Sequence, residues 1–388
     1  MSDWGARIVE AVDGMEARLR DVAKDLFEHP EVKFEEVRAS KRLAAELEAD
    51  GFDVELGVAG METAIRAVHP ASSEGPTVAI LGEYDALPEI GHACGHNLIA
   101  AAGLGAALAL GAIKDGIPGT LLFMGTPGEE GGGGKVLMID AGLFENVDAA
   151  MMFHPATNTI VDRGSLAITE VKIEFAGKPA HASGCPEKGI NALDAVIQTF
   201  NGINALRQHI KDDARIHGVI RDGGVKPNIV PEYASAEFYV RALETAYRDE
   251  LLKKVRGCAE GAALATGATL TWSEVGHAYK AMKPNHAMGE VFVKHLETLG
   301  EPLQPPKDNA LGSTDMGDVS QIVPSIHAYI KIAEEEVAGH SREFAEASGS
   351  ERGQQVMLIA AKAMAMTALD ILTEPGLSES LWKEFRVA

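Results

Sequence analysis

The sequence predicts an α/β protein with an open, mostly parallel sheet and an inserted α+β domain. Short apolar strand patterns alternate with helical patterns in the first part of the chain, which is typical of a parallel sheet. After residue 166 the strands lengthen and alternate in polarity, and after residue 279 the first pattern returns. We therefore expect one domain from residues 1–166 and 280–388, and a second domain from residues 167–279.

Composition narrows the class of protein. A chain of 388 residues exceeds the usual size of one core, and 46% hydrophobic with 24% charged residues is a globular composition. No run of about 18 apolar residues predicts a membrane span, and a formal charge of −22 argues against nucleic acid or an anionic membrane as a partner. Residues 1–7 do not resemble a signal peptide. Three cysteines, an odd number, favour a reducing compartment, so we expect a cytoplasmic protein.

The first domain is predicted from apolar periodicity and its breakers. A helix is expected through the first thirty residues, ended by His29 and Pro30. A second helix ends before Gly51, which suits a left-handed C-cap. The expected elements are helices at residues 37–50, 97–112 and 135–141, and strands at residues 53–56, 63–68, 77–81, 119–124 and 149–153.

The inserted domain and the tail follow the same reasoning. One sheet with two helices is expected in the insert, with strands at residues 166–175, 233–242 and 268–275 and helices at residues 189–209 and 246–266. In the tail we expect helices at residues 288–299 and 351–372 and a strand at residues 325–332.

Polar side chains collect just beyond the C-terminal ends of the predicted parallel strands. In open α/β sheets ligands bind at that edge. The residues concerned are Asp85, Glu129, Glu130 and His154. Their common position predicts a functional site there.

The turn of residues 91–97 (GHACGHN) precedes a long apolar helix and carries Cys94 and His96. Thiolate and imidazole are good ligands for zinc and related ions. Residues two apart in an extended turn point the same way, so both can reach one metal cluster. The alternative for Cys94 is a small buried hydrophobe.

Glu129 and Glu130 lie on a glycine-rich loop and would repel each other without a nearby cation. One can ligate a metal while the other, with a raised pKa, takes a proton from a metal-activated water. A solvated acidic turn is the alternative. His154 and His340 complete five candidate ligands for two ions, namely Cys94, His96, Glu130, His154 and His340.

Two other functions are compatible with the same residues. In a thiol hydrolase, Cys94 would be the nucleophile and His96 the base, but Glu129 and Glu130 would then be unexplained. A non-enzymatic metal or metabolite binder would not need the base, yet Glu129 is present.

The chain resembles the M20 metallopeptidases, a family that includes aminoacylases, glutamate carboxypeptidases and plant auxin-conjugate amidohydrolases. The resemblance covers essentially the whole chain. Its motifs are residues 85–88 (DALP), 92–96 (HACGH), 129–130 (EE) and 177–183 (GKPAHAS). Residues 81–88 (LGEYDALP) and 312–320 (GSTDMGDVS) resemble the aminobenzoyl-glutamate hydrolase and β-alanyl-lysine dipeptidase branch most.

The resemblance implies roles within the catalytic domain. Cys94 stands where many members have a bridging aspartate, and His96, Glu130, His154 and His340 are the other implied ligands. Glu129 is implied as the general base that activates water and then protonates the leaving amine. Asp85 is implied to orient a ligand imidazole.

The resemblance also implies roles for the insert, as a lid and dimerisation domain. His181 would reach the active site of the partner subunit and stabilise the oxyanion. Asn228 and Arg241 match positions that hold the substrate carboxylate.

Departures from the family pattern occur near the site. Glu83 stands where other members have a metal-binding histidine, and Asn97 stands where amidohydrolases often have aspartate. Asp315 and Asp318 are expected either to support His340 or to contact the substrate amine, with a solvated loop as a further alternative for Asp318. His92 is expected to be structural or to support the ligands.

The predicted function is metal-dependent hydrolysis of an amide bond in an N-acyl amino acid or small dipeptide with a free carboxylate. The resemblance implies two divalent ions, with zinc as the first choice and manganese or cobalt as alternatives. A homodimer through the lid domain is also implied. Neither the acyl group nor the released amino acid follows from the sequence.

Overall fold

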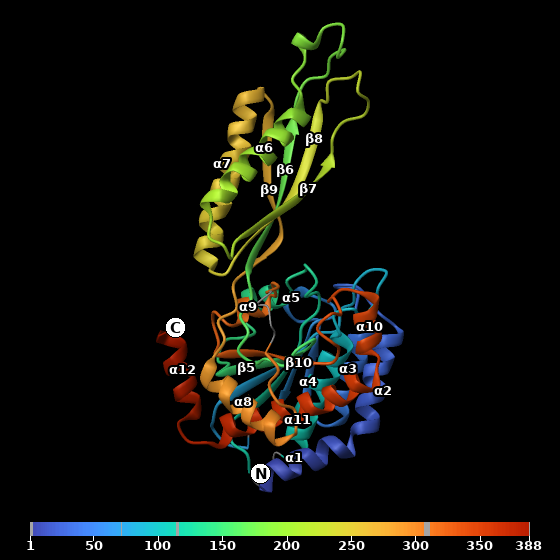
Figure 1. Cartoon of the computed structure of the whole chain (residues 1–388). Helices are drawn as coiled ribbons and strands as arrows, with labels where there is room; N and C mark the ends of the chain where they lie inside the picture. The colour runs from blue at the N-terminus through green and yellow to red at the C-terminus, as the bar shows by residue number, and fades with distance from the viewer. Residues whose placement is uncertain (1–2, 71, 114–115, 306–310, 388) are drawn as a thin grey trace. The chain divides into compact units, whose positions relative to one another are not determined.

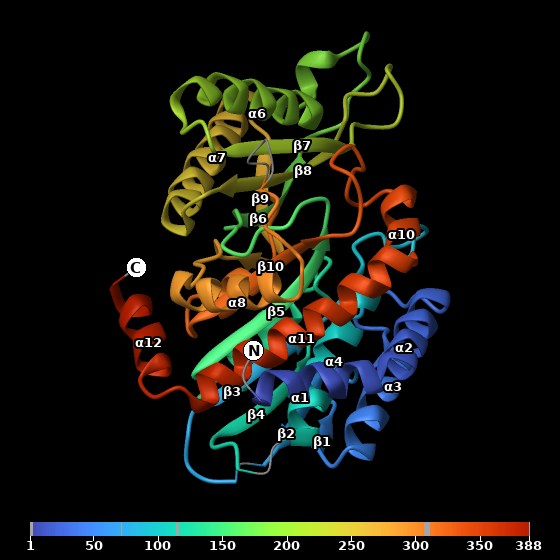
Figure 2. The same ribbon diagram turned by 60° about the horizontal axis from the view of Figure 1, so that its bottom comes forward.

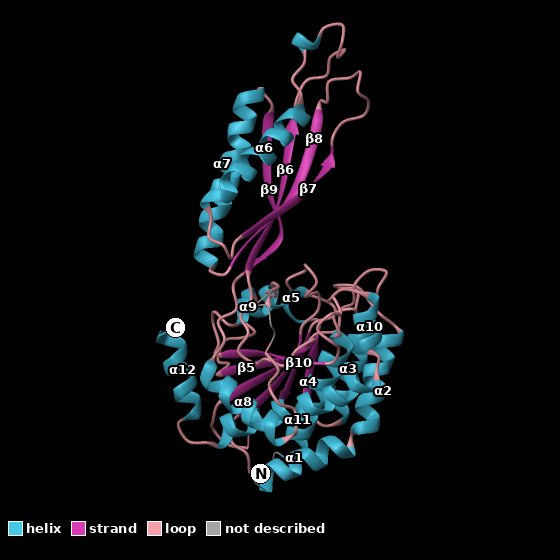
Figure 3. Cartoon of the chain, in the orientation of Figure 1, coloured by secondary structure: helices cyan, strands magenta, loops and turns pink. Residues whose placement is uncertain are grey.

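The computed structural model describes residues 3–70, 72–113, 116–305 and 311–387. Contacts divide the chain into two compact units, each with its own core. Unit 1 comprises Met1–Gly164, Met282–Leu311 and Asp315–Ala388, and unit 2 comprises Ser165–Ala281 and Gly312–Thr314. The two sheets and their helices are visible in Figures 1 and 3.

Unit 1 is built on a mostly parallel sheet of six strands in the order β1-β2-β4-β3-β5-β10 (Figure 2). Strands β4, β3, β5 and β10 are parallel to one another, and β1 and β2 form an antiparallel edge. The central strands are buried along nearly their whole length, which explains their continuous apolar sequences. The bounds are β1 (Asp53–Leu56), β2 (Ile65–His69), β3 (Thr77–Gly82), β4 (Thr120–Gly125), β5 (Ala149–Ala156) and β10 (Ser325–Lys331).

Two long apolar helices, α4 (His96–Ile113) and α11 (Glu351–Thr373), pack on each other and on this sheet. Both are long and apolar enough for a membrane span, but 89% and 78% of their apolar windows are buried in the protein. The close approach of α4 to β3 depends on Gly103, because a Cβ there would lie 2.8 Å from the Leu81 carbonyl oxygen. They are therefore core helices of unit 1.

The N-terminal helix is interrupted, although one continuous helix was expected. Helix α1 (Asp3–Gly14) ends before Met15, whose φ of −100° and ψ of 2° are not helical, and α2 (Glu16–Glu28) follows. The apolar periodicity continues across the break because Ile8, Val12 and Leu19 all face the same core. Periodicity alone therefore could not reveal the interruption. Helix α3 (Val37–Ala49) ends before Gly51, which has the expected left-handed φ of 83°.

Unit 2 is an antiparallel sheet of four strands in the order β7-β8-β6-β9, with α6 and α7 packed on one face. Buried and partly exposed residues alternate along β6, as expected for a sheet with one covered face. Strand β7 was not predicted, because only one of its residues is buried and it has little apolar periodicity. The bounds are β6 (Ala167–Ala176), α6 (Ala192–Leu206), β7 (Arg215–Asp222), β8 (Tyr233–Ala242), α7 (Thr245–Thr266) and β9 (Thr269–Tyr279).

The remaining helices of unit 1 are shorter. Helices α5 (Gly134–Asp140) and α8 (His286–Thr298) lie where helices were expected. Three others were not predicted, namely α9 (Met316–Val319), α10 (Arg342–Ser348) and α12 (Leu377–Val387). The first two are too short for a periodic signal, and α12 buries only Leu381.

Candidate metal centre

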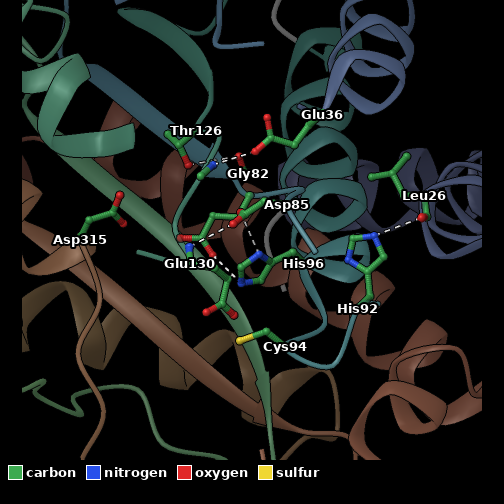
Figure 4. Close-up of polar contacts among 12 residues, drawn as sticks. Leu26, Glu36, Gly82, Asp85, His92, Cys94, His96, Thr126, Glu130 and Asp315 are labelled. Atoms are coloured by element: carbon green, nitrogen blue, oxygen red, sulfur yellow. Dashed lines mark hydrogen bonds and ion pairs between the residues drawn. The ribbon is translucent and has the colours of Figure 1, made fainter. Parts of the chain in front are cut away.

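Polar residues from three strand ends meet at the carboxyl edge of the unit 1 sheet. Asp85 follows β3, Glu129 and Glu130 follow β4, and His154 lies near the end of β5. Figure 4 shows Asp85, Glu130, His96 and Cys94 directed toward one another. The strand-end reasoning therefore located the cluster correctly.

The turn that carries Cys94 approaches β5 because residue 95 is glycine. Gly95 has a φ of 78°, and a Cβ there would lie 2.3 Å from Cγ of Pro155. The close approach places Cys94 Sγ 3.5 Å from Nε2 of His154. His96 is the first residue of α4 and is fully buried. The turn thus delivers both side chains to the strand ends.

Asp85 fixes the ring of His96. Its Oδ1 lies 3.1 Å from His96 Nδ1, and its Oδ2 accepts a hydrogen bond from the Glu130 main-chain N–H at 3.0 Å. Burial opposes the charge of the Asp85 carboxylate, but the neighbouring His96 holds its pKa below the usual value. The contact leaves Nε2 of His96 to face the centre of the cluster.

His340 reaches the same cluster from the loop before α10. Its main-chain N–H donates to the Ala93 carbonyl oxygen at 3.2 Å, and its Nε2 lies 3.4 Å from Oε1 of Glu130. The residue has a φ of 58°, a left-handed conformation that is uncommon for a residue with a Cβ. Such strain is often found at functional sites.

The donor atoms form overlapping groups, in each of which they lie within 4.8 Å of one another. Cys94 belongs to two of them, once with His96 and His154 and once with Glu130 and His340. A third group joins His96 to Glu129 and Glu130. The five predicted ligands and the predicted base are therefore all brought together.

Burial governs the electrostatics of this cluster. It raises the pKa of Glu129, and the carboxylates of Glu83, Glu130 and Asp315 raise it further. Burial also raises the pKa of the Cys94 thiol, and it lowers the pKa of His154 to about 4. Neutral forms of these groups are favoured unless a cation is present.

Two buried donor atoms of the cluster lack a hydrogen-bond partner in the described part of the chain. They are Nε2 of His96 and Oε1 of Glu130. Buried polar atoms are rarely left unpaired. Soft and borderline donors with uncompensated atoms fit a divalent transition-metal ion.

His92 and Asn97 flank the ligands but point away from the cluster. His92 Nε2 lies 3.1 Å from the Leu26 carbonyl oxygen (Figure 4), and Asn97 Nδ2 donates to the carbonyl oxygens of Ala23 and Ser348. Both contacts tie the turn to the helical layer. The structural role expected for His92 agrees with this position.

A buried ion-pair network at this edge was not predicted. Lys135 is fully buried, and its Nζ donates to Oε1 of Glu83 and to Oδ1 of Asp315, the latter at 2.8 Å. Asp315 thus contacts Lys135, a partner that was not considered for it. Asp318 is buried at 4% exposure, so the solvated alternative for this residue is wrong.

Glu36 is a second residue that sequence reasoning missed. Its buried carboxylate accepts hydrogen bonds from the main-chain N–H groups of Phe34 and Gly128 and from the Thr63 hydroxyl. Gly128 has a φ of 68° and directly precedes Glu129. Glu36 therefore supports the loop that carries the predicted base.

His327 and Tyr329 of β10 form an aromatic wall beside His154. Each ring centroid lies 5.3 Å from that of His154, and the Tyr329 hydroxyl is 3.2 Å from His327 Nδ1. The ring of His327 is buried, which lowers its pKa well below the usual value. Neither residue belongs to the motifs of the sequence, and an alternating strand gives no signal for such a wall.

The other predicted residues belong to unit 2. His181 and Asn228 lie on neighbouring exposed segments, joined by the bridge between His181 and Ile229 and by the hydrogen bond from Ala182 N–H to the Asn228 carbonyl oxygen. Arg241 is half-buried, and its Nη1 donates to Ser313 Oγ at 3.4 Å. These three residues therefore belong to a different compact unit from the metal ligands.

Comparison with known proteins identifies the family. The model of peptidase family M20/M25/M40 matches residues 79–363. Xaa-Arg dipeptidase of Mus musculus is 39% identical over 397 residues, which cover 98% of this chain and 91% of that protein. The chain belongs to peptidase family M20/M25/M40. The resemblance found in its motifs is thus confirmed.

Other family members cover the chain equally well. One polypeptide of the p-aminobenzoyl-glutamate hydrolase of Escherichia coli is 31% identical over 97% of this chain and 94% of its own length. Two solved structures share the M20 fold. They are a dinuclear metal-binding peptidase of Bacillus subtilis (21% identity, TM-score 0.71, 93% of this chain and 99% of that chain) and an aminobenzoyl-glutamate utilization protein of Klebsiella pneumoniae (22%, 0.74, 93% and 97%).

Proposed function

We propose that this protein hydrolyses the amide bond of a dipeptide or N-acyl amino acid with the help of two divalent metal ions. The position of Cys94 carries the proposal, because its sulfur belongs to two donor groups. One contains His96 and His154, and the other contains Glu130 and His340. A thiolate shared in this way can hold two adjacent ions.

The chemistry of the donors agrees with the metals proposed. One thiol, three imidazoles and one carboxylate suit zinc, and also accommodate manganese or cobalt. Ions held there would polarise the scissile carbonyl and lower the pKa of the attacking water to about 7. His96 Nε2 and Glu130 Oε1, which are buried without a hydrogen-bond partner in the described chain, would gain one.

Glu129 is the proposed base of the reaction. It lies in one donor group with His96 and Glu130, and its raised pKa allows it to hold a proton. Its carboxylate takes a proton from water as the water oxygen attacks the carbonyl carbon. It gives that proton to the amine nitrogen when the C–N bond breaks.

The substrate class is proposed from unit 2 and from the relatives. The Arg241 guanidinium has a buried Nε without a hydrogen-bond partner among the described residues, so it has donors to spare for a substrate carboxylate. Asn228 would add a further hydrogen bond to this carboxylate. His181 would stabilise the oxyanion. Relatives named as a dipeptidase and as a p-aminobenzoyl-glutamate hydrolase support substrates that end in an amino acid.

We also propose a cytoplasmic homodimer formed through unit 2. Strand β7 is an edge of the unit 2 sheet, and it exposes Val219 and Ile220 by 54% and 46%. An apolar edge strand favours pairing with another strand. Ile220→Lys should give a monomer in analytical ultracentrifugation, and an unchanged dimer would contradict this interface. A reducing compartment suits Cys94, Cys185 and Cys258, which are all unpaired.

Removal of metal tests the function against the thiol alternative. Dialysis against EDTA should abolish hydrolysis of dipeptides, aminobenzoyl-glutamate and N-acyl amino acids, and Zn²⁺, Mn²⁺ or Co²⁺ should restore it. Burial raises the pKa of Cys94 and lowers that of His154, so this pair does not form a thiolate and imidazolium unaided. Activity that survives the chelator but not iodoacetamide would establish the thiol mechanism instead.

A further inference from the structure

Three carboxylates gather on the side of the metal centre away from Cys94. Oxygen atoms of Glu83, Glu129 and Asp315 lie within 4.8 Å of one another. Glu83 and Asp315 are buried at 1% and 0% exposure. Burying several carboxylates together is unfavourable unless a cation compensates them.

The cation at this position is the side chain of Lys135. Its ammonium group donates to Oε1 of Glu83 and to Oδ1 of Asp315, and its main-chain N–H donates to Oδ2 of Asp315 at 3.0 Å. Asp315 therefore holds both ends of the residue. Burial opposes the charge of the ammonium, but Asp315 and Glu83 outweigh it and raise the pKa of Lys135.

Glu83 connects this ion pair to a metal ligand. While Oε1 is held by Lys135, Oε2 lies 3.4 Å from Nε2 of His96. Oε2 is buried and has no hydrogen-bond partner in the part of the chain that the structure describes. The orientation of Glu83 beside the imidazole thus depends on the ammonium behind it.

We propose that Lys135 is a positioning residue whose ammonium fills the cation position between Glu83, Glu129 and Asp315. It confines divalent ions to the side of Cys94, and it holds Glu83 against His96. This inference rests on the proposed metal-dependent function. It assigns a purpose to the carboxylate that replaces a histidine at position 83.

Metal content tests the proposal without reference to activity. Lys135→Met, Lys135→Arg, wild type and the control Lys362→Met would be equilibrated with MnCl₂ and analysed by plasma mass spectrometry. Lys362 pairs with Asp13 on another part of unit 1. Mn²⁺ accepts carboxylate ligands readily. Wild type, Lys135→Arg and Lys362→Met should hold two ions, and Lys135→Met should hold a third.

A count of two ions in folded Lys135→Met would overturn the proposal. If that variant does not fold, Lys135→Met with Asp315→Asn replaces it, because the pair removes one charge of each sign. We then expect metal affinity to fall about 10–100-fold, as for other groups that orient ligands. Wild-type metal affinity and kcat/KM in the folded double variant would also overturn the proposal.

The same measurements separate this inference from the proposed function. Wild-type protein that binds no divalent ion would refute the metal-dependent function, and the role of Lys135 with it. Two ions in the wild type together with two in Lys135→Met would refute the role of Lys135 alone.

Discussion

The two units of the molecule differ in what their sheets bury. In unit 1, the strand ends enclose a cluster of buried charges, in which Lys135, Asp85 and Glu83 are nearly inaccessible to water. In unit 2, the sheet buries an apolar core on one face, and His181 and Asn228 are exposed. Buried polar groups require complete networks of partners, whereas exposed residues remain available for a ligand.

This difference suggests a division of labour. The groups proposed to make and break bonds are fixed in unit 1 by buried contacts, such as those between Asp85, His96 and Glu130. The groups proposed to hold the substrate lie in unit 2 and have unused hydrogen-bonding capacity, as Arg241 does. Substitutions in each unit should therefore differ in whether they affect metal binding, catalysis or stability.

Replacement of Glu129 by Gln should have the largest effect. The amide cannot accept and return a proton, so kcat should fall by about 10²–10⁴-fold, the range for loss of general acid–base catalysis. Metal content should remain at the wild-type value, because Glu129 is not among the proposed ligands. Steady-state kinetics and plasma mass spectrometry measure the two quantities.

The control for this prediction is the neighbouring carboxylate. Glu130→Gln removes a proposed ligand that lies in a donor group with Cys94 and His340, so it should lose metal as well as activity. A near-normal rate in Glu129→Gln, or equal metal loss in both variants, would show that the base has been assigned to the wrong residue.

His181 tests whether the exposed residues of unit 2 take part in the reaction. His181→Ala should lower kcat by about 10²–10³-fold if its imidazole stabilises the oxyanion. Mixing inactive His181→Ala chains with inactive Glu129→Gln chains should restore part of the activity, because a hybrid dimer contains one site with both residues intact. Activity is measured after the two kinds of chain have exchanged between dimers.

Failure of the mixed sample to regain activity would argue against a role in the partner subunit. Ser183→Ala is the matched control, because its hydroxyl contacts His181 Nδ1 at 3.3 Å but carries no proposed role in the reaction. Its kcat should stay close to that of the wild type.

The fold and the ligands could be predicted from sequence because their signals are local. Apolar periodicity marked the strands, and the residues just after them, such as Asp85 and Glu130, then had to lie at one sheet edge. The resemblance to known proteins supported His340, which has no strand-end position of its own. Strand β7 escaped prediction because it is exposed and lacks an apolar pattern.

The supporting contacts could not be predicted because they join distant parts of the chain. Lys135 and Asp315 are separated by 180 residues, and Glu36 and Gly128 by 92. Each of these side chains has an ordinary sequence environment. Only the folded chain reveals that Lys135 and Glu36 are buried beside the site.

Asp85 tests whether the buried contacts of unit 1 matter for metal binding. Asp85→Asn weakens the contact to His96 Nδ1, so metal affinity or activity should fall about 10–100-fold. Competition with a fluorescent chelator measures the affinity. Asp370→Asn is the control, because it alters a similar contact, 2.7 Å to His295, outside the cluster. Equal affinities in the two variants would contradict the orienting role.

The smallest effect concerns the pH dependence of stability through Glu36. Burial raises the pKa of Glu36 from its ordinary value of 4.5 to about 7 in the folded protein, with a further contribution from Asp85. The unfolded chain therefore releases this proton first, and stability should fall as pH rises from about 4.5 through about 7. The loss amounts to about 3 kcal/mol at 1.36 kcal/mol per pKa unit. Glu36→Gln cannot titrate, so its thermal unfolding should lack this part of the pH dependence.

A difference in slope, rather than in absolute stability, decides the outcome. Glutamine loses acceptors for Phe34 and Gly128 and can lower the melting temperature at every pH, but only a titrating carboxyl group changes the melting temperature between pH 5 and 8. Glu174→Gln in unit 2 is the control, because Tyr233 and Lys172 lower the pKa of this exposed carboxylate and its titration lies below this range. Parallel curves for wild type and Glu36→Gln would show that unit 1 tolerates an ionised carboxylate there, supported by the three hydrogen bonds it accepts.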